Sequence, residues 1–128
     1  MDLVIKDKIK SIIESHLQYG VVWKIQNSVH YGEKHLKKRQ NRGDIDESWT
    51  LADYDKHIVN IMSGINNDVH IYWLSHFTQR DFCFDDGSWI VMCGENGVMV
   101  TCMKGNPQNY FKNNPGYAYL GKVKDVLK

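Results

Sequence analysis

The sequence predicts an α+β fold in which N-terminal helices pack on an antiparallel meander of about four strands. Apolar residues recur at helical spacing through residues 1–65, as amphipathic helices require. From residue 69 to residue 103 they instead occur in short, partly alternating runs that are typical of strands. Asn96-Gly97 separates two of these runs, and this dipeptide between apolar runs is a strong hairpin signal. Helices followed by antiparallel strands indicate the α+β class.

The first half of the chain is expected to hold three helices. The first covers residues 3–17 and stops at Tyr19-Gly20. The second begins with Ser28 as its N-cap and runs to about Gln40. The third begins with Thr50 as its N-cap and ends near Gly64. The apolar stripe of this third helix comprises Tyr54, Ile58, Ile61, Met62 and Ile65.

The sheet is expected between residues 69 and 103. Its strands are expected at residues 69–75, 80–84, 88–93 and 98–103. If Asn96 and Gly97 are the two loop residues of the last hairpin, Glu95 pairs with Val98 and Met92 faces Thr101. Residues 105–117, which include both prolines, are expected to be loop. Residues 117–127 fit either a last strand or a short helix.

Length and composition predict one domain, with residues 1–65 mainly helical, 69–103 in the sheet and 104–128 loop-rich. The 128 residues are 42% apolar and 24% charged, which is ordinary for a globular protein. The longest apolar runs are about five residues, too short to cross a membrane, and no basic-then-apolar leader opens the chain. The three cysteines show no CxxC spacing and suggest reduced thiols in a cytoplasmic protein.

Charge is unevenly distributed, although the net charge is only +1. Residues 24–42 contain six Lys or Arg and one acid, and residues 104–128 contain five Lys and one acid. Residues 44–55 contain five acids and no Lys or Arg, and are expected to form a solvated loop and helix cap. The two basic segments could form one phosphate-binding surface, or they could be solvated faces that partly cancel the acidic one.

The second expected helix contains most of the candidate catalytic and phosphate-binding residues. His35 and Arg39 are four residues apart and share a face, with Tyr31 one turn before them and Arg42 just beyond. A second stack at the same spacing comprises His30, Lys34 and Lys38. A histidine can transfer a proton near neutral pH, and cations can stabilise a pentacovalent phosphorane. This combination suits cleavage of RNA without a metal or other cofactor, through attack of the ribose 2′-hydroxyl on its own phosphate. A basic surface helix with an incidental histidine remains the alternative.

A family resemblance rests on residues 34–39, 80–82, 89–92 and 96–101. These read Lys-His-Leu-Lys-Lys-Arg, Arg-Asp-Phe, Trp-Ile-Val-Met and Asn-Gly-Val-Met-Val-Thr. Across residues 28–104 the order of elements resembles the barnase, EndoU, colicin and RelE-like group of small ribonuclease toxins. That group includes C-terminal modules of contact-dependent inhibition and polymorphic toxin systems.

The resemblance implies a ribonuclease that acts in the cytoplasm without a metal, often on transfer RNA, and is neutralised by an immunity protein or antitoxin. It implies that His35 is the general base or acid, that Lys34 or Arg39 stabilises the phosphorane, and that Thr101 contacts the scissile phosphate from the last strand. The chain departs from the group's pattern in having several candidate histidines and no second catalytic acid at a fixed spacing. The assignment of acid and base therefore stays open.

Several other residues are further candidates for the site. His30 is either the partner acid or base, or a surface residue at a helix N-terminus. Substrate contacts are expected from Lys37, Lys38, Arg42 and Tyr31 on the second helix, and from His76 and Arg80 beyond the first strand of the sheet. A second hypothesis is a non-catalytic RNA- or protein-binding module, such as an antitoxin, immunity protein or phage accessory protein. A third, a zinc enzyme using His70, His76 and Cys83, has no supporting ligand spacing.

Overall fold

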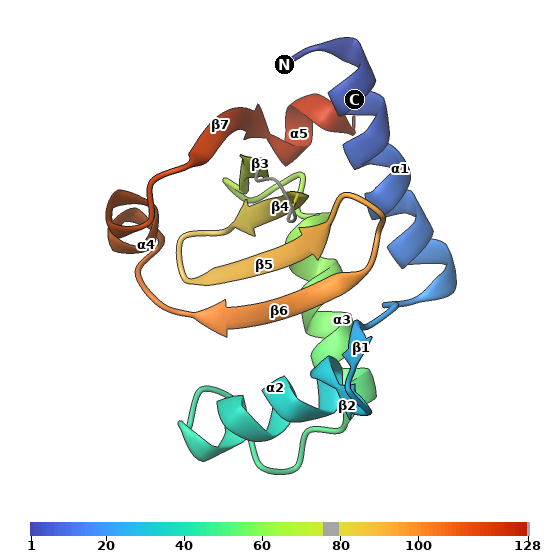
Figure 1. Cartoon of the computed structure of the whole chain (residues 1–128), viewed down its shortest axis with the longest axis vertical. Coiled ribbons are helices and arrows are strands. Elements are labelled where there is room, and N and C mark those ends of the chain that lie inside the picture. The colour runs from blue at the N-terminus through green and yellow to red at the C-terminus, as the bar shows by residue number, and fades with distance from the viewer. Residues whose placement is uncertain (76–79, 128) are drawn as a thin grey trace.

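The computed structural model describes residues 1–75 and 80–127, and it confirms the α+β class (Figure 1). The helices are α1 (Leu3–Tyr19), α2 (Tyr31–Asn41), α3 (Leu51–Met62), α4 (Pro107–Asn113) and α5 (Val123–Val126). The strands are β1 (Ile25–Gln26), β2 (Val29–His30), β3 (His70–Ser75), β4 (Arg80–Asp85), β5 (Trp89–Gly94), β6 (Met99–Lys104) and β7 (Tyr117–Lys122). Within the described ranges, no helix combines the length and the apolar character that crossing a membrane requires.

The main sheet has the strand order β6-β5-β4-β3-β7, and each neighbouring pair is antiparallel. The expected four-strand meander is confirmed as β3 to β6. β7 joins it beside β3, so β6 and β7 are the two edges of the sheet. In Figure 1, α2 lies at the lower end of the molecule alongside the β6 edge, whereas α5 lies at the upper end with β7.

The two faces of the sheet have separate apolar layers. One layer packs α1, α3 and α5 against side chains such as Ile71, Phe82 and Phe84, as the alternation in β3 and β4 predicted. The other layer contains Cys83 and Ile90 of the strands and is covered by aromatic residues of α4. The three cysteines are buried and unpaired.

The first and third helices agree with the sequence patterns. Asp2 caps α1, and Gly20 ends it. Thr50 caps α3 and forms a capping box with Asp53, in which each side chain accepts a hydrogen bond from the other residue's backbone N–H. Ile65 does not belong to the stripe of α3, because the helix ends at Met62 and the Ile65 side chain is exposed.

The predicted N-cap of the second helix is wrong. Asn27 and Ser28 adopt left-handed conformations, with φ of 53° and 63°, and form the two-residue turn between β1 and β2. His30 caps α2 instead, because its Nδ1 atom accepts a hydrogen bond from the Glu33 backbone N–H at 3.2 Å. The helix therefore starts after a small hairpin, and it ends at Asn41, close to the expected end.

The prediction of a loop-rich C-terminal segment is also wrong. Pro107 lies at the start of α4, where its missing N–H breaks no helical bond, and the Asn106 side chain caps the helix by accepting from the Asn109 backbone N–H. The segment left open between strand and helix contains both, since β7 is followed directly by α5.

The hairpin between β5 and β6 has the predicted pairing of Met92 with Thr101. Its loop is longer than the expected two residues. The register shifts after Met92, and the Gly94 N–H donates to the Val98 carbonyl at 2.8 Å. Glu95 therefore does not pair with Val98. Beyond the bulge the chain turns through Gly97, whose φ is 86°.

Candidate functional site

The start of α2 is fixed by the segment that precedes it. Trp23 forms a parallel bridge with Met99 of β6, and the Lys24 backbone N–H donates to the Met99 carbonyl at 2.9 Å. The Tyr31 N–H then donates to the Lys24 carbonyl at 3.0 Å. Gly32 permits this approach, because a Cβ at that position would stand 2.7 Å from the Trp23 indole. The N-terminal end of α2 is thus attached to the β6 edge through backbone hydrogen bonds.

Arg39 fixes the other end of α2 to the same strand. Its Nε donates to the Cys102 carbonyl at 2.8 Å, and its second terminal nitrogen donates to Thr101 Oγ1 at 3.3 Å. The Tyr54 hydroxyl of α3 donates to the same Cys102 carbonyl. Arg39 is 3% exposed and Thr101 is 9% exposed. The structure therefore brings these two predicted catalytic residues together, but it leaves neither with a surface that a phosphate could reach.

His35 lies one turn before Arg39 and is half-buried. Its ring meets the Tyr31 ring edge-on, with 5.8 Å between the ring centroids, and its Nδ1 atom is buried without a hydrogen-bond partner. Burial, and the nearby charges of Arg39, Lys34 and Lys38, lower the pKa of His35 to about 4. The imidazole is therefore neutral at neutral pH and has a lone pair that can accept a proton.

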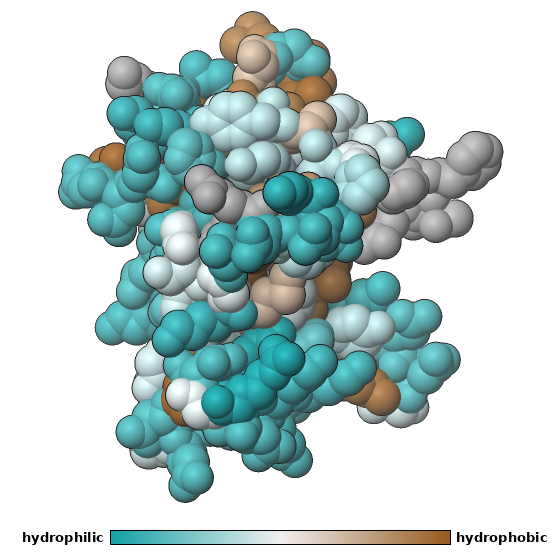
Figure 2. Space-filling model, turned by 90° about the vertical axis from the view of Figure 1, so that its left-hand side faces the viewer, coloured by the Kyte–Doolittle hydropathy of each residue, from teal (hydrophilic) through white to brown (hydrophobic). Residues whose placement is uncertain are grey.

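The outer face of α2 carries the cations expected there. Lys34, Lys37, Lys38 and Arg42 are all exposed. Within residues 1–75 and 80–127, none of the four forms an ion pair. The lower end of the molecule, where Figure 1 places α2, presents a largely hydrophilic surface in Figure 2. These cations are available to an anionic partner.

His30 lies on a different side of α2 from His35. Its ring packs near Gly32, where a Cβ would stand 2.8 Å from the His30 Cε1 atom, and it faces the Trp23 side of the helix. Among the described ring contacts, His35 meets Tyr31 but not His30. The structure thus places His30 as a helix cap and does not bring it beside His35 as a partner acid or base.

Arg80 is remote from α2. It begins β4, two strands from β6. Its side chain is 61% exposed, and its guanidinium lies 3.9 Å from a Glu95 carboxylate oxygen. His76 lies outside the described residues. In the part of the chain that is described, no three His, Cys, Asp or Glu side chains are grouped so that they could hold a metal ion.

Asp55 was expected to be solvated, but it is half-buried and accepts a hydrogen bond from Trp23 Nε1 at 2.7 Å. Burial raises its pKa, and this indole hydrogen bond opposes the rise. No sequence pattern indicates this pair, because 32 positions separate the two residues. Lys24 was not predicted as a site residue, but its ammonium nitrogen lies 5.3 Å from the centre of the Tyr31 ring.

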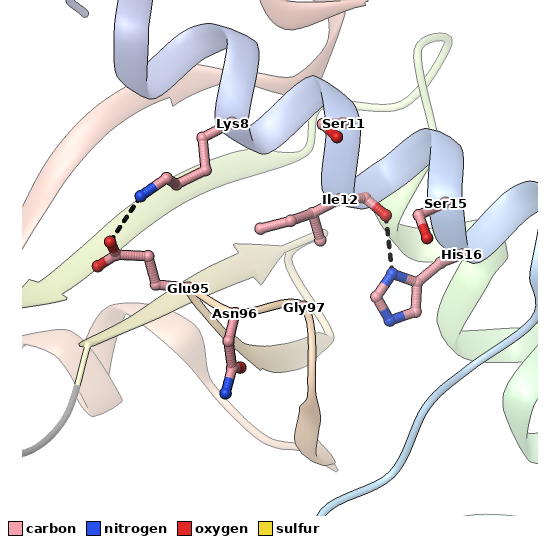
Figure 3. Close-up of a pocket in the computed structure, with 8 residues that line it drawn as sticks. All are labelled: Lys8, Ser11, Ile12, Ser15, His16, Glu95, Asn96 and Gly97. Carbon is pink, nitrogen blue, oxygen red and sulfur yellow. Dashed lines mark hydrogen bonds and ion pairs between the residues drawn. The ribbon is translucent and has the colours of Figure 1, made fainter.

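A separate groove of about 410 Å³ lies between α1 and the β5–β6 turn (Figure 3). Lys8 closes one side through a 2.6 Å ion pair with Glu95, and His16 lines the other. The His16 ring is buried, and its Nδ1 atom donates a hydrogen bond to the Ile12 carbonyl at 2.7 Å. Nδ1 must carry the proton, because a carbonyl oxygen can only accept. The groove contains none of the residues predicted for catalysis.

Comparison with known proteins identifies no relative. No protein-family model matches the sequence, and neither a curated protein nor a solved structure matches it significantly.

Proposed function

We propose that the protein is a metal-independent endoribonuclease with its reaction centre at His35. The observation that supports this most directly is a neutral, half-buried imidazole among exposed cations that have no acidic partner in the described chain. Such a base can take a proton from a substrate whose phosphates the cations bind. Arg39 supports the proposal indirectly, because its bonds to β6 hold the helix that carries His35.

In the proposed reaction, His35 accepts the proton of a ribose 2′-hydroxyl. The 2′ oxygen attacks the neighbouring phosphorus, the bond from phosphorus to the 5′ oxygen breaks, and the 5′ oxygen takes a proton from water. The products are a 2′,3′-cyclic phosphate and a 5′-hydroxyl end. Lys38, which is exposed on α2, stabilises the negative charge that develops on the phosphorane.

Substrate binding itself would strengthen this base. Lys34 and Lys38 contribute to the low pKa of His35 through their positive charges. Phosphates that bind these ammonium groups offset those charges, so the pKa of His35 rises toward its ordinary value when RNA is bound. The base then holds a proton more firmly when substrate is present, which favours removal of the 2′ proton.

The test is incubation of the protein with a synthetic RNA oligonucleotide, with transfer RNA as a second substrate, in EDTA. We expect fragments that end in a 2′,3′-cyclic phosphate. His35→Ala should abolish cleavage while binding survives. The matched control is His70→Ala on β3, the strand next to the β7 edge, and this variant should cleave normally. Intact RNA with the wild-type protein would refute the proposal.

A second candidate is a non-catalytic RNA- or protein-binding module. The observation that favours it is the burial of Arg39 and Thr101, which removes two groups that the resemblance assigns to phosphate chemistry. In such a module His35→Ala has little effect, and charge reversal at Lys37 and Lys38 abolishes binding.

If the enzyme is a delivered toxin, it acts in the cytoplasm of the target cell, where its RNA substrate lies. An immunity protein or antitoxin would then neutralise it by presenting carboxylates to the exposed cations of α2.

A further inference from the structure

Two lysines from different segments share one aromatic ring beside His35. The ammonium nitrogen of Lys24 lies 5.3 Å from the centre of the Tyr31 ring, and that of Lys34 lies 5.5 Å from it. Both distances are within the range of cation–π attraction. The two ammonium groups are therefore separated by no more than the sum of these distances.

The framework of this cluster is held by hydrogen bonds. The Lys24 backbone is bonded to β6 through the Met99 carbonyl and to α2 through the Tyr31 N–H. The Tyr31 hydroxyl donates to Gln26 Oε1 at 3.1 Å, which fixes the far end of the ring. The ring thus has a defined position between the hairpin β1–β2 and the helix.

The ring attracts the ammonium groups without neutralising them. Neither Lys24 nor Lys34 forms an ion pair within the described ranges of the chain. Two like charges beside one ring both contribute to the positive potential there, so a strand that passes the ring is attracted by both. Tyr31 also restricts two flexible side chains before any ligand binds, which lowers the entropy lost on binding.

We propose that Lys24, Tyr31 and Lys34 form a subsite for backbone phosphates of a single-stranded RNA, next to the position of the scissile phosphate at His35. The two lysines contact phosphate, and Tyr31 is a positioning residue that holds them. This subsite rests on the proposed function, since it assumes that the same strand reaches His35. It differs from base stacking on Tyr31, because two ammonium groups already lie over the ring.

A substrate preference follows from the subsite. A dinucleoside monophosphate has only the scissile phosphate, so it cannot also occupy the lysine pair. A longer strand has flanking phosphates and gains these contacts. We expect the protein to prefer oligonucleotides over dinucleoside monophosphates.

The test measures binding of a fluorescent, fully 2′-deoxy hexanucleotide, which cannot be cleaved through a 2′-hydroxyl, over a range of KCl concentrations. Each lost phosphate contact reduces the slope of log K against log salt by about 0.7 for a single strand. We expect the slope of K24Q/K34Q to be smaller than that of the wild type by about 1.4. K124Q, which changes an exposed lysine of α5, should keep the wild-type slope.

Tyr31 variants test the positioning role. Tyr31→Phe keeps the ring and should bind nearly as the wild type does, whereas Tyr31→Leu should weaken binding several-fold and equally for purine and pyrimidine strands. A loss that depends on the base would show stacking and overturn this role. An unchanged slope for K24Q/K34Q, or no binding by the wild type, would overturn the subsite. Because the probe is uncleavable, a protein that binds it through the lysines but leaves RNA intact refutes only the proposed catalysis.

Discussion

The buried environment of His35 makes a measurable contribution to stability that depends on pH. Its pKa is 6.5 in the unfolded chain and about 4 in the folded protein. Between these two values the unfolded state binds more protons, so stability is present above pH 6.5 and is lost as the pH falls toward 4. At pH 5 the linkage relation gives an upper limit of about 2 kcal/mol for the loss in the free energy of unfolding. Solvent screening at a half-buried ring reduces this loss to about 1 kcal/mol.

The assay is urea unfolding of the wild type and of His35→Asn at pH 7 and pH 5. When the pH is lowered from 7 to 5, the free energy of unfolding of the wild type should fall by about 1 kcal/mol more than that of the variant. The double difference removes the effect of other groups, including His57, whose pKa is also lowered by burial. Equal losses in the two proteins would show that His35 titrates normally when folded, and the argument for a neutral base held by its surroundings would fail.

Two further predictions concern how α2 is attached to the sheet. Arg39→Ala removes two buried hydrogen bonds and packed methylenes, so it should lower the free energy of unfolding by about 2 kcal/mol in chemical denaturation. The exposed control Arg42→Ala should stay within about 0.5 kcal/mol of the wild type. Equal effects of the two substitutions would argue against an anchoring role for Arg39. Gly32→Ala places a methyl group 2.7 Å from the Trp23 indole and should destabilise the protein by about 1–3 kcal/mol. In Gly105→Ala the added Cβ meets nothing within 4 Å, so a loss there as large as at Gly32 would contradict this steric argument.

The parts of the fold that depend on local chemistry were predictable from the sequence. Thr50 begins α3 because its hydroxyl and the Asp53 carboxylate satisfy backbone groups within one turn. The pairing of Met92 with Thr101 was also predicted, although it arises from a longer turn together with a register shift after Met92 and not from the expected two-residue turn. Both features involve residues close together in the chain, so no tertiary information is needed to place them.

The errors arose where the usual meaning of a residue type was reversed by its position. Ser28 is a common N-cap, but here it and Asn27 adopt positive φ in a turn that glycine usually occupies. Pro107 suggests a loop from its residue type, but here it lies in the first turn of a helix, where proline is favoured. The spacing of residues alone did not distinguish these cases.

The candidate site was predictable only in part. Helical spacing places His35 and Arg39 on one face, but it does not say that this face meets the β6 edge or that Arg39 is buried there. Lys24 joins the site because the backbone before β1 is bonded to β6, and nothing near Lys24 in the sequence indicates that contact. The position of Lys24 depends on tertiary structure, which a single sequence does not show.

In the proposed enzyme, His35 and Arg39 would act together although only His35 would reach the substrate, because Arg39 is buried. Arg39 fixes α2 to β6 through Cys102 and Thr101, and its charge lowers the pKa of the adjacent His35. Loss of Arg39 would therefore move the imidazole and raise its pKa at the same time. A role for this arginine in catalysis should accordingly appear as a shifted pH profile of cleavage in Arg39 variants, and not only as a lower rate.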